Sequence, residues 1–370
     1  MNIRKLLFWV HLIVGCCAAV FIFLMSITGA ALTYERQIIK MAEQADYPVV
    51  LAAPQKALPI ANFVALAAQY ATENTPEITI MRDNAAPILL KDGRKTIAYL
   101  HPFTAETMQQ PGAPTKIFFS RLRAFHRWLT LDGKFSGSGR WVNGIANTIF
   151  VFLALSGLYL WLPKRLHYRA FKQKLTLGGH YPTKQVKHYQ WHNVFGFYVM
   201  PALIVMAVTA LFFSFKWPGQ TLKHYTSTAM NALPMPVKLP EHDAAKVLSI
   251  DKQLAIIQQH FPDWQNIRFS LSDHPSNVQI FKIDSGNGGE PQKRVSVAQH
   301  TITGELIQQQ SFSQLSDYRQ ARSYIRFLHT GEVFGLVGQT IAGIASLFAC
   351  LLVYTGVMLS WRRWQNSRAK

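Results

Sequence analysis

The sequence has little cysteine, with only Cys16, Cys17 and Cys350 among its 370 residues. All three lie in long apolar runs, so the polar segments of the chain contain no cysteine. This distribution excludes a disulfide framework and a cysteine zinc site, because both need several cysteines outside such runs. Small packing residues between helices are the simplest interpretation of the three.

Acidic residues are also scarce, with 19 Asp and Glu against 38 Lys and Arg, a net charge of +19. The sequence lacks a Gly-x-Gly-x-x-Gly turn after a strand, which a nicotinamide or flavin domain would use to bind phosphate. We also find no His-Glu-x-x-His or Ser-His-Asp arrangement. The sequence therefore predicts neither a hydride-transfer domain nor a hydrolase.

The main feature that the sequence does contain is a set of long apolar runs. Four of them exceed the roughly 20 helical residues that cross a hydrocarbon core, and their central parts carry no charged residue. We predict a membrane α-helical protein with four spans, at residues 6–33, 141–162, 194–215 and 336–361. The first run is longer than the roughly 7–15 residues of a signal peptide and no small-residue cleavage site follows it, so we expect it to be retained.

The basic residues flanking the spans predict their orientation. Those on one side of the expected membrane are Arg4, Lys5, Lys164, Arg165, Arg169, Lys172, Lys174, Lys184, Lys187, Arg362, Arg363, Arg368 and Lys370. Because basic flanking loops stay in the cytoplasm, the loop 163–191, the tail 362–370 and both termini should be cytoplasmic. Segments 35–125 and 216–328 should be exported. The excess positive charge thus reports topology rather than nucleic-acid binding.

An internal repeat divides the chain into two halves. Each half contains the same markers in the same order: a His with Gly four residues later, a Thr near the end of that span, an Arg three residues before a second His, and a hydroxyl–Gly pair in the next span. The markers are His11, Gly15, Thr28, Arg123, His126, Ser156 and Gly157 in the first half, and His192, Gly196, Thr209, Arg326, His329, Thr355 and Gly356 in the second.

The exported segments repeat as well. In the first, an amphipathic helix at 60–70 is followed by strand candidates at 78–81, 88–90 and 96–100. In the second, the helix is at 250–260 and the strand candidates are at 267–271, 278–283 and 294–298. Each set ends in a turn, around residues 100–107 and 299–306. We therefore predict two small α+β modules outside the membrane.

With these markers the sequence resembles the bacterial PepSY-associated transmembrane proteins over nearly its whole length. The resemblance rests on the order and duplication of the markers, including Gly29 after Thr28. One departure is that His101 and His300 replace the acidic residue usual before the turn, a position that looks structural. The resemblance implies an iron-regulated inner-membrane protein of Gram-negative bacteria, with PepSY-like periplasmic modules. Some relatives are similar to ferrisiderophore reductases that hold two haems.

Histidines at membrane depth are the candidate cofactor ligands, because neutral imidazole suits iron and ionisable groups there are costly. We predict that His11 and His192 hold one b-type haem, and that Gly15 and Gly196 leave room for the porphyrin one turn away. The alternatives are that His192 is an ordinary interfacial residue, or that His188 takes its place.

The second predicted pair of axial ligands is His126 with His329. Arg123 and Arg326, one in each half, would neutralise the haem propionates. The alternative is a set of surface histidines. The remaining histidines, His188 among them, lie in polar segments and are predicted to be solvated.

These features predict a di-haem electron-transfer protein, a ferric-chelate reductase that releases Fe(II) from a periplasmic siderophore complex. The electron donor would be a cytoplasmic reductase or the quinone pool, because the loop 163–191 is too short to fold a donor domain. One alternative is a non-catalytic PepSY membrane protein that binds or regulates a partner such as a peptidase. Another is a siderophore transporter, against which the uncharged span centres argue.

Overall fold

The structure is a computed structural model that describes residues 2–47, 57–70, 76–93, 95–130, 135–164, 167–229, 232–270 and 274–368. These residues form two compact units. The first, which we call the helical unit, contains Met1–Glu35, Ile117–Tyr225 and Arg322–Lys370. The second, the sheet unit, contains Arg36–Lys116 and Thr226–Ala321.

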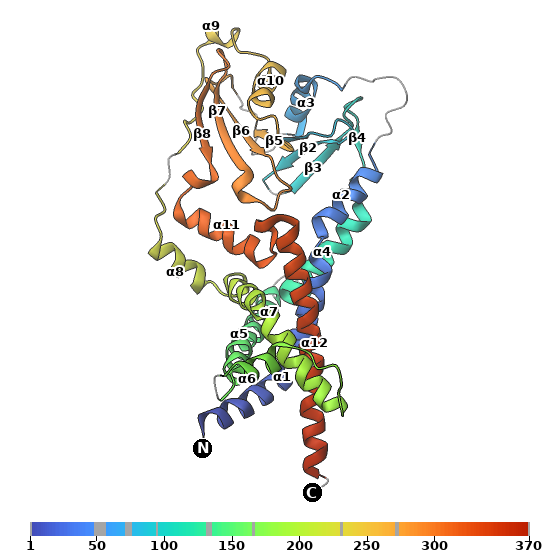
Figure 1. The fold of residues 1–370 in the computed structure, drawn as a ribbon. Helices are drawn as coiled ribbons and strands as arrows, with labels where there is room; N and C mark the ends of the chain where they lie inside the picture. Colours follow the sequence, from blue (N-terminus) through green and yellow to red (C-terminus); the bar gives the residue numbers. More distant parts are fainter. Residues whose placement is uncertain are drawn as a thin grey trace. The chain divides into compact units, whose positions relative to one another are not determined.

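Four long helices make up the helical unit: α1 (Ile3–Leu32), α5 (Ser136–Trp161), α7 (Lys184–Ser214) and α12 (Gly335–Arg368) (Figure 1). All four are long and apolar enough to cross a membrane. The four predicted spans are therefore confirmed as apolar helices, each longer in the structure than its apolar run because polar turns extend it.

Each long helix packs on two others. Helices α1 and α7 both lie against α5 and against α12, so α1 and α7 occupy opposite corners of the bundle. Small residues line these contacts, including buried Ala18, Ala146, Ala207 and Ala345. Close approach of small residues drives helix association where lipid removes the hydrophobic effect between helices.

The extra length of α7 corrects one prediction. His188 was expected to be solvated in the loop 163–191, but α7 begins at Lys184 and the His188 side chain is only 8% exposed. Its ring meets the Tyr354 ring edge to face, with 5.5 Å between centroids. The prediction was wrong because the helix continues through polar residues beyond the apolar run.

Shorter helices complete the chain. They are α2 (Glu35–Ala45), α3 (Ile60–Ala67), α4 (Ala113–Trp128), α6 (Tyr168–Leu175), α8 (Trp217–Tyr225), α9 (Glu241–Ala244), α10 (Ile250–His260) and α11 (Asp317–His329). Short 3-10 turns lie at Ala68–Tyr70, Pro291–Lys293, Phe312–Gln314 and Glu332–Phe334.

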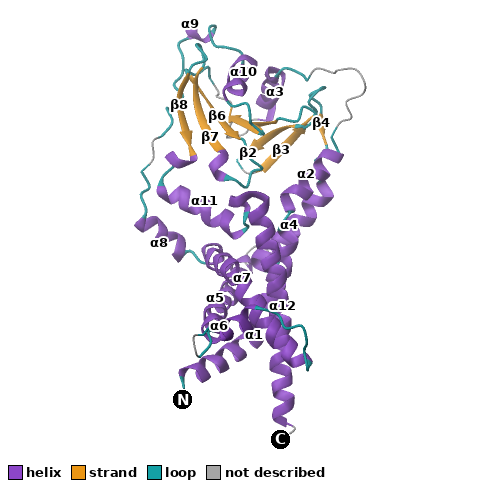
Figure 2. Ribbon diagram, in the orientation of Figure 1, coloured by secondary structure: helices purple, strands orange, loops and turns teal. Residues whose placement is uncertain are grey.

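One antiparallel sheet of eight strands organises the sheet unit, in the order β4-β3-β2-β1-β5-β6-β7-β8 (Figure 2). The strands are β1 (Glu77–Met81), β2 (Ile88–Asp92), β3 (Lys95–Leu100), β4 (Thr107–Met108), β5 (Asn266–Ser270), β6 (Val278–Asp284), β7 (Arg294–His300) and β8 (Leu306–Ser311). The six predicted strands and two predicted helices are present, whereas β4 and β8 were missed because they are short or polar.

Helices α3 and α10 cover one face of this sheet (Figure 2). The core between them contains Phe63, Ile257, Phe269 and Phe281, each no more than 1% exposed. Alternate residues of the strands supply this core, as expected of a sheet with one buried face.

The sequence does not predict that the strands of segments 35–125 and 216–328 form a single sheet. Strand β1 pairs antiparallel with β5, placing Thr79 opposite Arg268. Asp251, in the first turn of α10, accepts hydrogen bonds from the backbone N–H groups of Ile60 and Ala61, at 2.6 and 3.3 Å. One carboxylate thus caps the first turn of the neighbouring helix α3 and ties the two halves of the unit together.

Replacement of this cap tests the connection. Asp251→Ala should leave the first N–H groups of α3 without an acceptor, a loss of about 1 kcal/mol for a typical cap. We expect amide hydrogen exchange of the peptide containing Ile60–Ala67 to speed up by roughly five-fold. Gln259→Ala, at an exposed position of α10, is the matched control and should leave that peptide unchanged. Equal exchange in both variants would rule out the cap.

Candidate functional site

Two of the four predicted histidine ligands lie on opposite corners of the helix bundle. His11 on α1 and His192 on α7 each contact a hydroxyl group on a neighbouring helix. His11 Nδ1 is 2.8 Å from Ser156 Oγ on α5, and His192 Nδ1 is 3.0 Å from Thr355 Oγ1 on α12.

The other two repeat this arrangement. His126, near the end of α4, places Nδ1 2.8 Å from Thr28 Oγ1 on α1. His329, the last residue of α11, places Nδ1 3.2 Å from Thr209 Oγ1 on α7 and 2.9 Å from the Met206 carbonyl oxygen. Each of the four predicted ligands therefore has a hydroxyl partner on a different helix.

The protons of these bonds can be assigned. A carbonyl oxygen only accepts, so the Nδ1 atom of His329 must carry the proton that it shares with Met206. Ser156, Thr28, Thr209 and Thr355 donate their own hydroxyl protons to the helix carbonyls of Leu153, Leu24, Val205 and Leu351, at 3.3, 2.6, 2.6 and 2.9 Å. Their oxygens accordingly accept from Nδ1–H. In a neutral imidazole of this tautomer, Nε2 holds the free lone pair.

Glycines beside the hydroxyl residues leave room for the rings. A Cβ added to Gly157 or Gly356 would lie 3.4 Å from Cε1 of His11 or His192, respectively. A Cβ on Gly29 would lie 3.5 Å from Cε1 of His126. At three of the four sites the residue after the hydroxyl is thus a glycine that faces the imidazole, whereas Thr209 is followed by Ala210.

His126 and His329 come together in space. Their ring centroids are 6.4 Å apart, with the ring planes tilted by 53°. A metal ion about 2 Å from the facing nitrogen of each of two imidazoles also separates the centroids by about 6 Å. The two rings therefore have the spacing of a pair of axial ligands.

A model of the PepSY-associated transmembrane region matches residues 8–363. The chain belongs to the PepSY-associated transmembrane family. The match includes all four histidines, their four hydroxyl partners and the segments 35–125 and 216–328. No curated protein matches the chain.

In this PepSY-associated protein His126 and His329 are kept neutral. Burial, together with the neighbouring His329, lowers the pKa of His126 to about 3. Burial also lowers the pKa of His329. Both imidazoles are consequently uncharged at neutral pH, the state in which a ring nitrogen can bind a metal.

The arginines near this pair have different partners. Arg123, a predicted propionate partner, forms an ion pair with Glu35. Arg127 is the cation whose charge acts on both His126 and His329, and burial with repulsion from Arg140 and Arg123 lowers its own pKa. Arg326, the other predicted partner, lies over the Phe327 ring at 5.2 Å. Arg127 is therefore the arginine that is available to an anionic group beside these two rings.

The two predicted cofactor glycines of the first and third spans face side chains. A Cβ on Gly15 would meet Leu153 at 3.6 Å, and a Cβ on Gly196 would meet Leu352 at 3.5 Å. Both are ordinary packing distances between neighbouring helices. Gly157 and Gly356, rather than Gly15 and Gly196, are the glycines whose added Cβ would face the imidazoles. The role of Gly15 and Gly196 beside a porphyrin stays a prediction.

Histidines of the sheet unit form the opposite kind of bond. His101 Nδ1 accepts from the backbone N–H groups of Phe103 and Thr104, each at 3.3 Å, and His300 Nδ1 accepts from Ile302 and Thr303, at 3.3 and 3.2 Å. These bonds close the turns after β3 and β7. The structural role predicted for both positions is confirmed.

Nitrogen NMR of the metal-free, histidine-labelled protein tests these assignments. His11, His126, His192 and His329 should show the Nδ1–H tautomer, because their Nδ1 atoms donate to hydroxyl oxygens. His101 and His300 are internal controls and should show the Nε2–H tautomer. An Nε2–H signal from His126 or His329 would contradict the proposed bonding.

Proposed function

We propose that this protein holds two b-type haems, one between His11 and His192 and one between His126 and His329, and uses them to reduce a ferric chelate outside the cytoplasm. The substrate class is an Fe(III) siderophore or similar chelate. The protein is then a ferric-chelate reductase of the bacterial inner membrane, with both termini cytoplasmic and the sheet unit periplasmic.

The observation that carries the proposal is the hydrogen bond between each of the four histidine Nδ1 atoms and a hydroxyl oxygen. Metal-bound histidines usually donate their second ring N–H to a fixed acceptor, which sets the tautomer and the ring orientation. Here four helix hydroxyls do so, two from each half of the chain. A histidine with a purely structural role can use either ring nitrogen as its donor. A histidine that binds iron through Nε2 must carry its proton on Nδ1. The same choice at four positions supports ligation.

Further support comes from the 6.4 Å spacing of the outer rings and from the cation beside them. Haem supplies reversible one-electron chemistry when it is bound. Its two carboxylates need cations, and the guanidinium of Arg127 or Arg123 would bind one through paired hydrogen bonds. The predicted role of Arg326, neutralisation of a haem propionate from the second half of the chain, stays a prediction.

Reduction would release the iron. Fe(III) is a hard ion that matches hydroxamate or catecholate oxygen, and Fe(II) fits these donors less well. The chain needs no general acid or nucleophile for this reaction. The protein would bind the redox centres, tune their potentials and exclude water from them.

Haem content of single variants tests the ligand pairs. The purified protein should contain two haems per chain by pyridine haemochrome absorbance. His11→Ala or His192→Ala should each remove one haem, and His126→Ala or His329→Ala the other, because a low-spin centre needs both axial ligands. His180→Ala, at an exposed position, is the control and should keep both.

A colourless but folded wild-type protein would overturn the proposal. It would favour the alternative, a membrane protein whose exported unit binds a partner such as a peptidase. Loss of both haems, or of neither, in a single variant would contradict the pairing.

The hydroxyl partners should tune potential rather than haem content. Thr28→Val or Thr355→Val removes the acceptor for one Nδ1–H group, which makes the imidazole a weaker donor and disfavours Fe(III). A bond worth about 0.5–1.5 kcal/mol corresponds to a rise of about 20–60 mV in one midpoint potential, measured by redox titration.

Thr148→Val is the matched control for this titration. Thr148 lies on α5 and donates only to the Gly144 carbonyl, at 2.9 Å, far in sequence from any predicted ligand. Its replacement should leave both potentials unchanged. Equal shifts in Thr148→Val and Thr28→Val would show a general packing effect and remove the role of the hydroxyl.

A further inference from the structure

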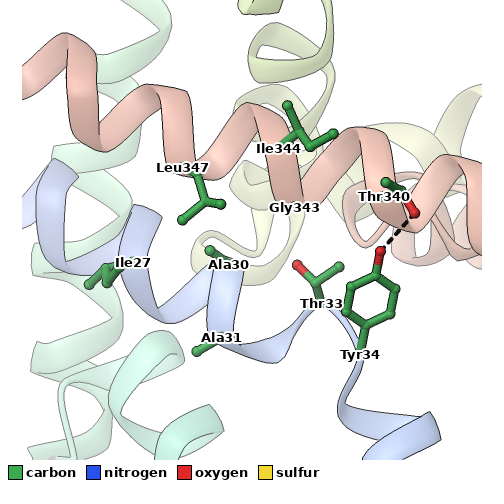
Figure 3. Close-up of a pocket in the computed structure, with 9 residues that line it drawn as sticks. All are labelled: Ile27, Ala30, Ala31, Thr33, Tyr34, Thr340, Gly343, Ile344 and Leu347. Atoms are coloured by element: carbon green, nitrogen blue, oxygen red, sulfur yellow. Dashed lines mark hydrogen bonds between the residues drawn. The ribbon is translucent and has the colours of Figure 1, made fainter.

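A groove of about 380 Å³ lies between α1 and α12 in the helical unit (Figure 3). Ala30 and Ala31 on α1 and Gly343 and Leu347 on α12 form its apolar part, and Thr33, Tyr34 and Thr340 form its polar end (Figure 3). Tyr34 and Leu347 are 38% and 54% exposed. Because these side chains are exposed and both helices are apolar enough to span a membrane, we infer that the groove opens toward lipid.

The corresponding place, between α7 and α5, is filled by larger side chains. The alignment that puts His11 on His192 puts Ala30 and Ala31 on Leu211 and Phe212, and Tyr34 on Phe215. The alignment that puts Ser156 on Thr355 puts Thr340 on Trp141. Phe215 and Trp141 pack edge to face with their centroids 5.2 Å apart, in place of the Tyr34–Thr340 hydrogen bond of 2.7 Å.

A glycine makes a close contact at both places. A Cβ on Gly343 would lie 2.8 Å from Thr33 Oγ1 and 3.3 Å from Thr33 Cβ, and a Cβ on Gly144 would lie 2.9 Å from Ser214 Cβ. The side chains at the groove are smaller and more polar. Two alanines stand where the other place has Leu and Phe, and a hydroxyl pair stands where it has two apolar rings.

The hydroxyl groups at the polar end already donate their protons to other groups of the protein. Thr340 donates to the Leu336 carbonyl at 2.7 Å, so Tyr34 must be the donor in its bond to Thr340. Thr33 donates to the Gly29 carbonyl at 3.3 Å. The hydroxyl oxygens of Thr33 and Tyr34 can therefore only accept further hydrogen bonds in the groove. A ligand that fits the groove has hydroxyl donors at one end and an apolar tail.

We propose that this groove binds a membrane quinol, with a ring hydroxyl donating to the Tyr34 oxygen and the prenyl tail along Ala30, Ala31 and Leu347. A quinone ring and the ester groups of a phospholipid carry only acceptors, so the polar end disfavours both. The volume lies within the range of about 300–1,000 Å³ typical of ligand pockets.

The groove adjoins the outer histidine pair. Ala30 and Ala31 directly follow Thr28, which bonds His126, and Gly29, which the His126 ring touches. A quinol bound here would lie beside the proposed redox site. It would be the electron donor, for which the sequence predicts no domain in this chain. This role rests on the proposed function. One quinol and two Fe(III) chelates give one quinone, two protons and two Fe(II) chelates, which balances electrons and charge.

Direct binding tests the groove. The full-length protein, reduced beforehand under argon, is placed in nanodiscs of quinone-free phospholipid and equilibrated with a decyl-tailed benzoquinol. Bound quinol is measured by mass spectrometry against empty nanodiscs. We expect saturable binding near one per chain, at least five-fold tighter for the quinol than for the quinone.

Two variants locate the site. Ala31→Phe copies the residue of the filled half and should abolish binding, whereas Val20→Phe, at a 66% exposed position of the same helix, should not alter it. Tyr34→Phe removes the acceptor and should weaken quinol binding about two- to ten-fold while leaving quinone binding unchanged.

Equal binding in Ala31→Phe and wild type, equal affinity for quinone and quinol, or no binding above empty nanodiscs would overturn the groove as a quinol site. Haem absorbance of the same samples separates this result from the proposed function. A coloured protein that binds no quinol refutes the groove alone. A colourless protein that binds quinol through Tyr34 retains the groove and refutes the reductase.

Discussion

The hydrogen bond from an imidazole Nδ1–H to a helix hydroxyl is the interaction on which the helical unit depends. A donor buried among apolar helices without an acceptor costs about 1–3 kcal/mol, and water is not available there to replace the partner. Four histidines meet this requirement with Ser156, Thr355, Thr28 and Thr209. Each bond joins two different helices and fixes one ring, so the helix packing and the orientation of the candidate ligands have the same cause.

The two halves of the chain use this interaction alike but differ around it. One half has Leu211 and Phe212 where the other has Ala30 and Ala31. A glycine, Gly343 or Gly144, makes a close contact beside either set. The histidine–hydroxyl bonds therefore occur in both halves, whereas the groove forms only between α1 and α12 among the places compared.

Much of the molecule follows from local patterns in the sequence. Apolar length predicted four membrane helices, and alternation predicted six strands and the helices α3 and α10. The order of histidines in the repeat selected His126 and His329, and the structure brings them together. Local patterns failed where polar residues continue an element, as at His188 in α7, or where a strand is short and polar, as in β4 and β8.

What the sequence determined by itself was therefore the set of elements and the candidate ligands, because hydropathy and periodicity are properties of neighbouring residues. Only the tertiary structure decided which hydroxyl each histidine bonds, that β1 pairs with β5 in one sheet, and that a groove forms beside Tyr34. Those partners are far apart in the chain: His11 and Ser156 are separated by 145 positions. Their pairing depends on how helices and strands pack, and no local pattern records that.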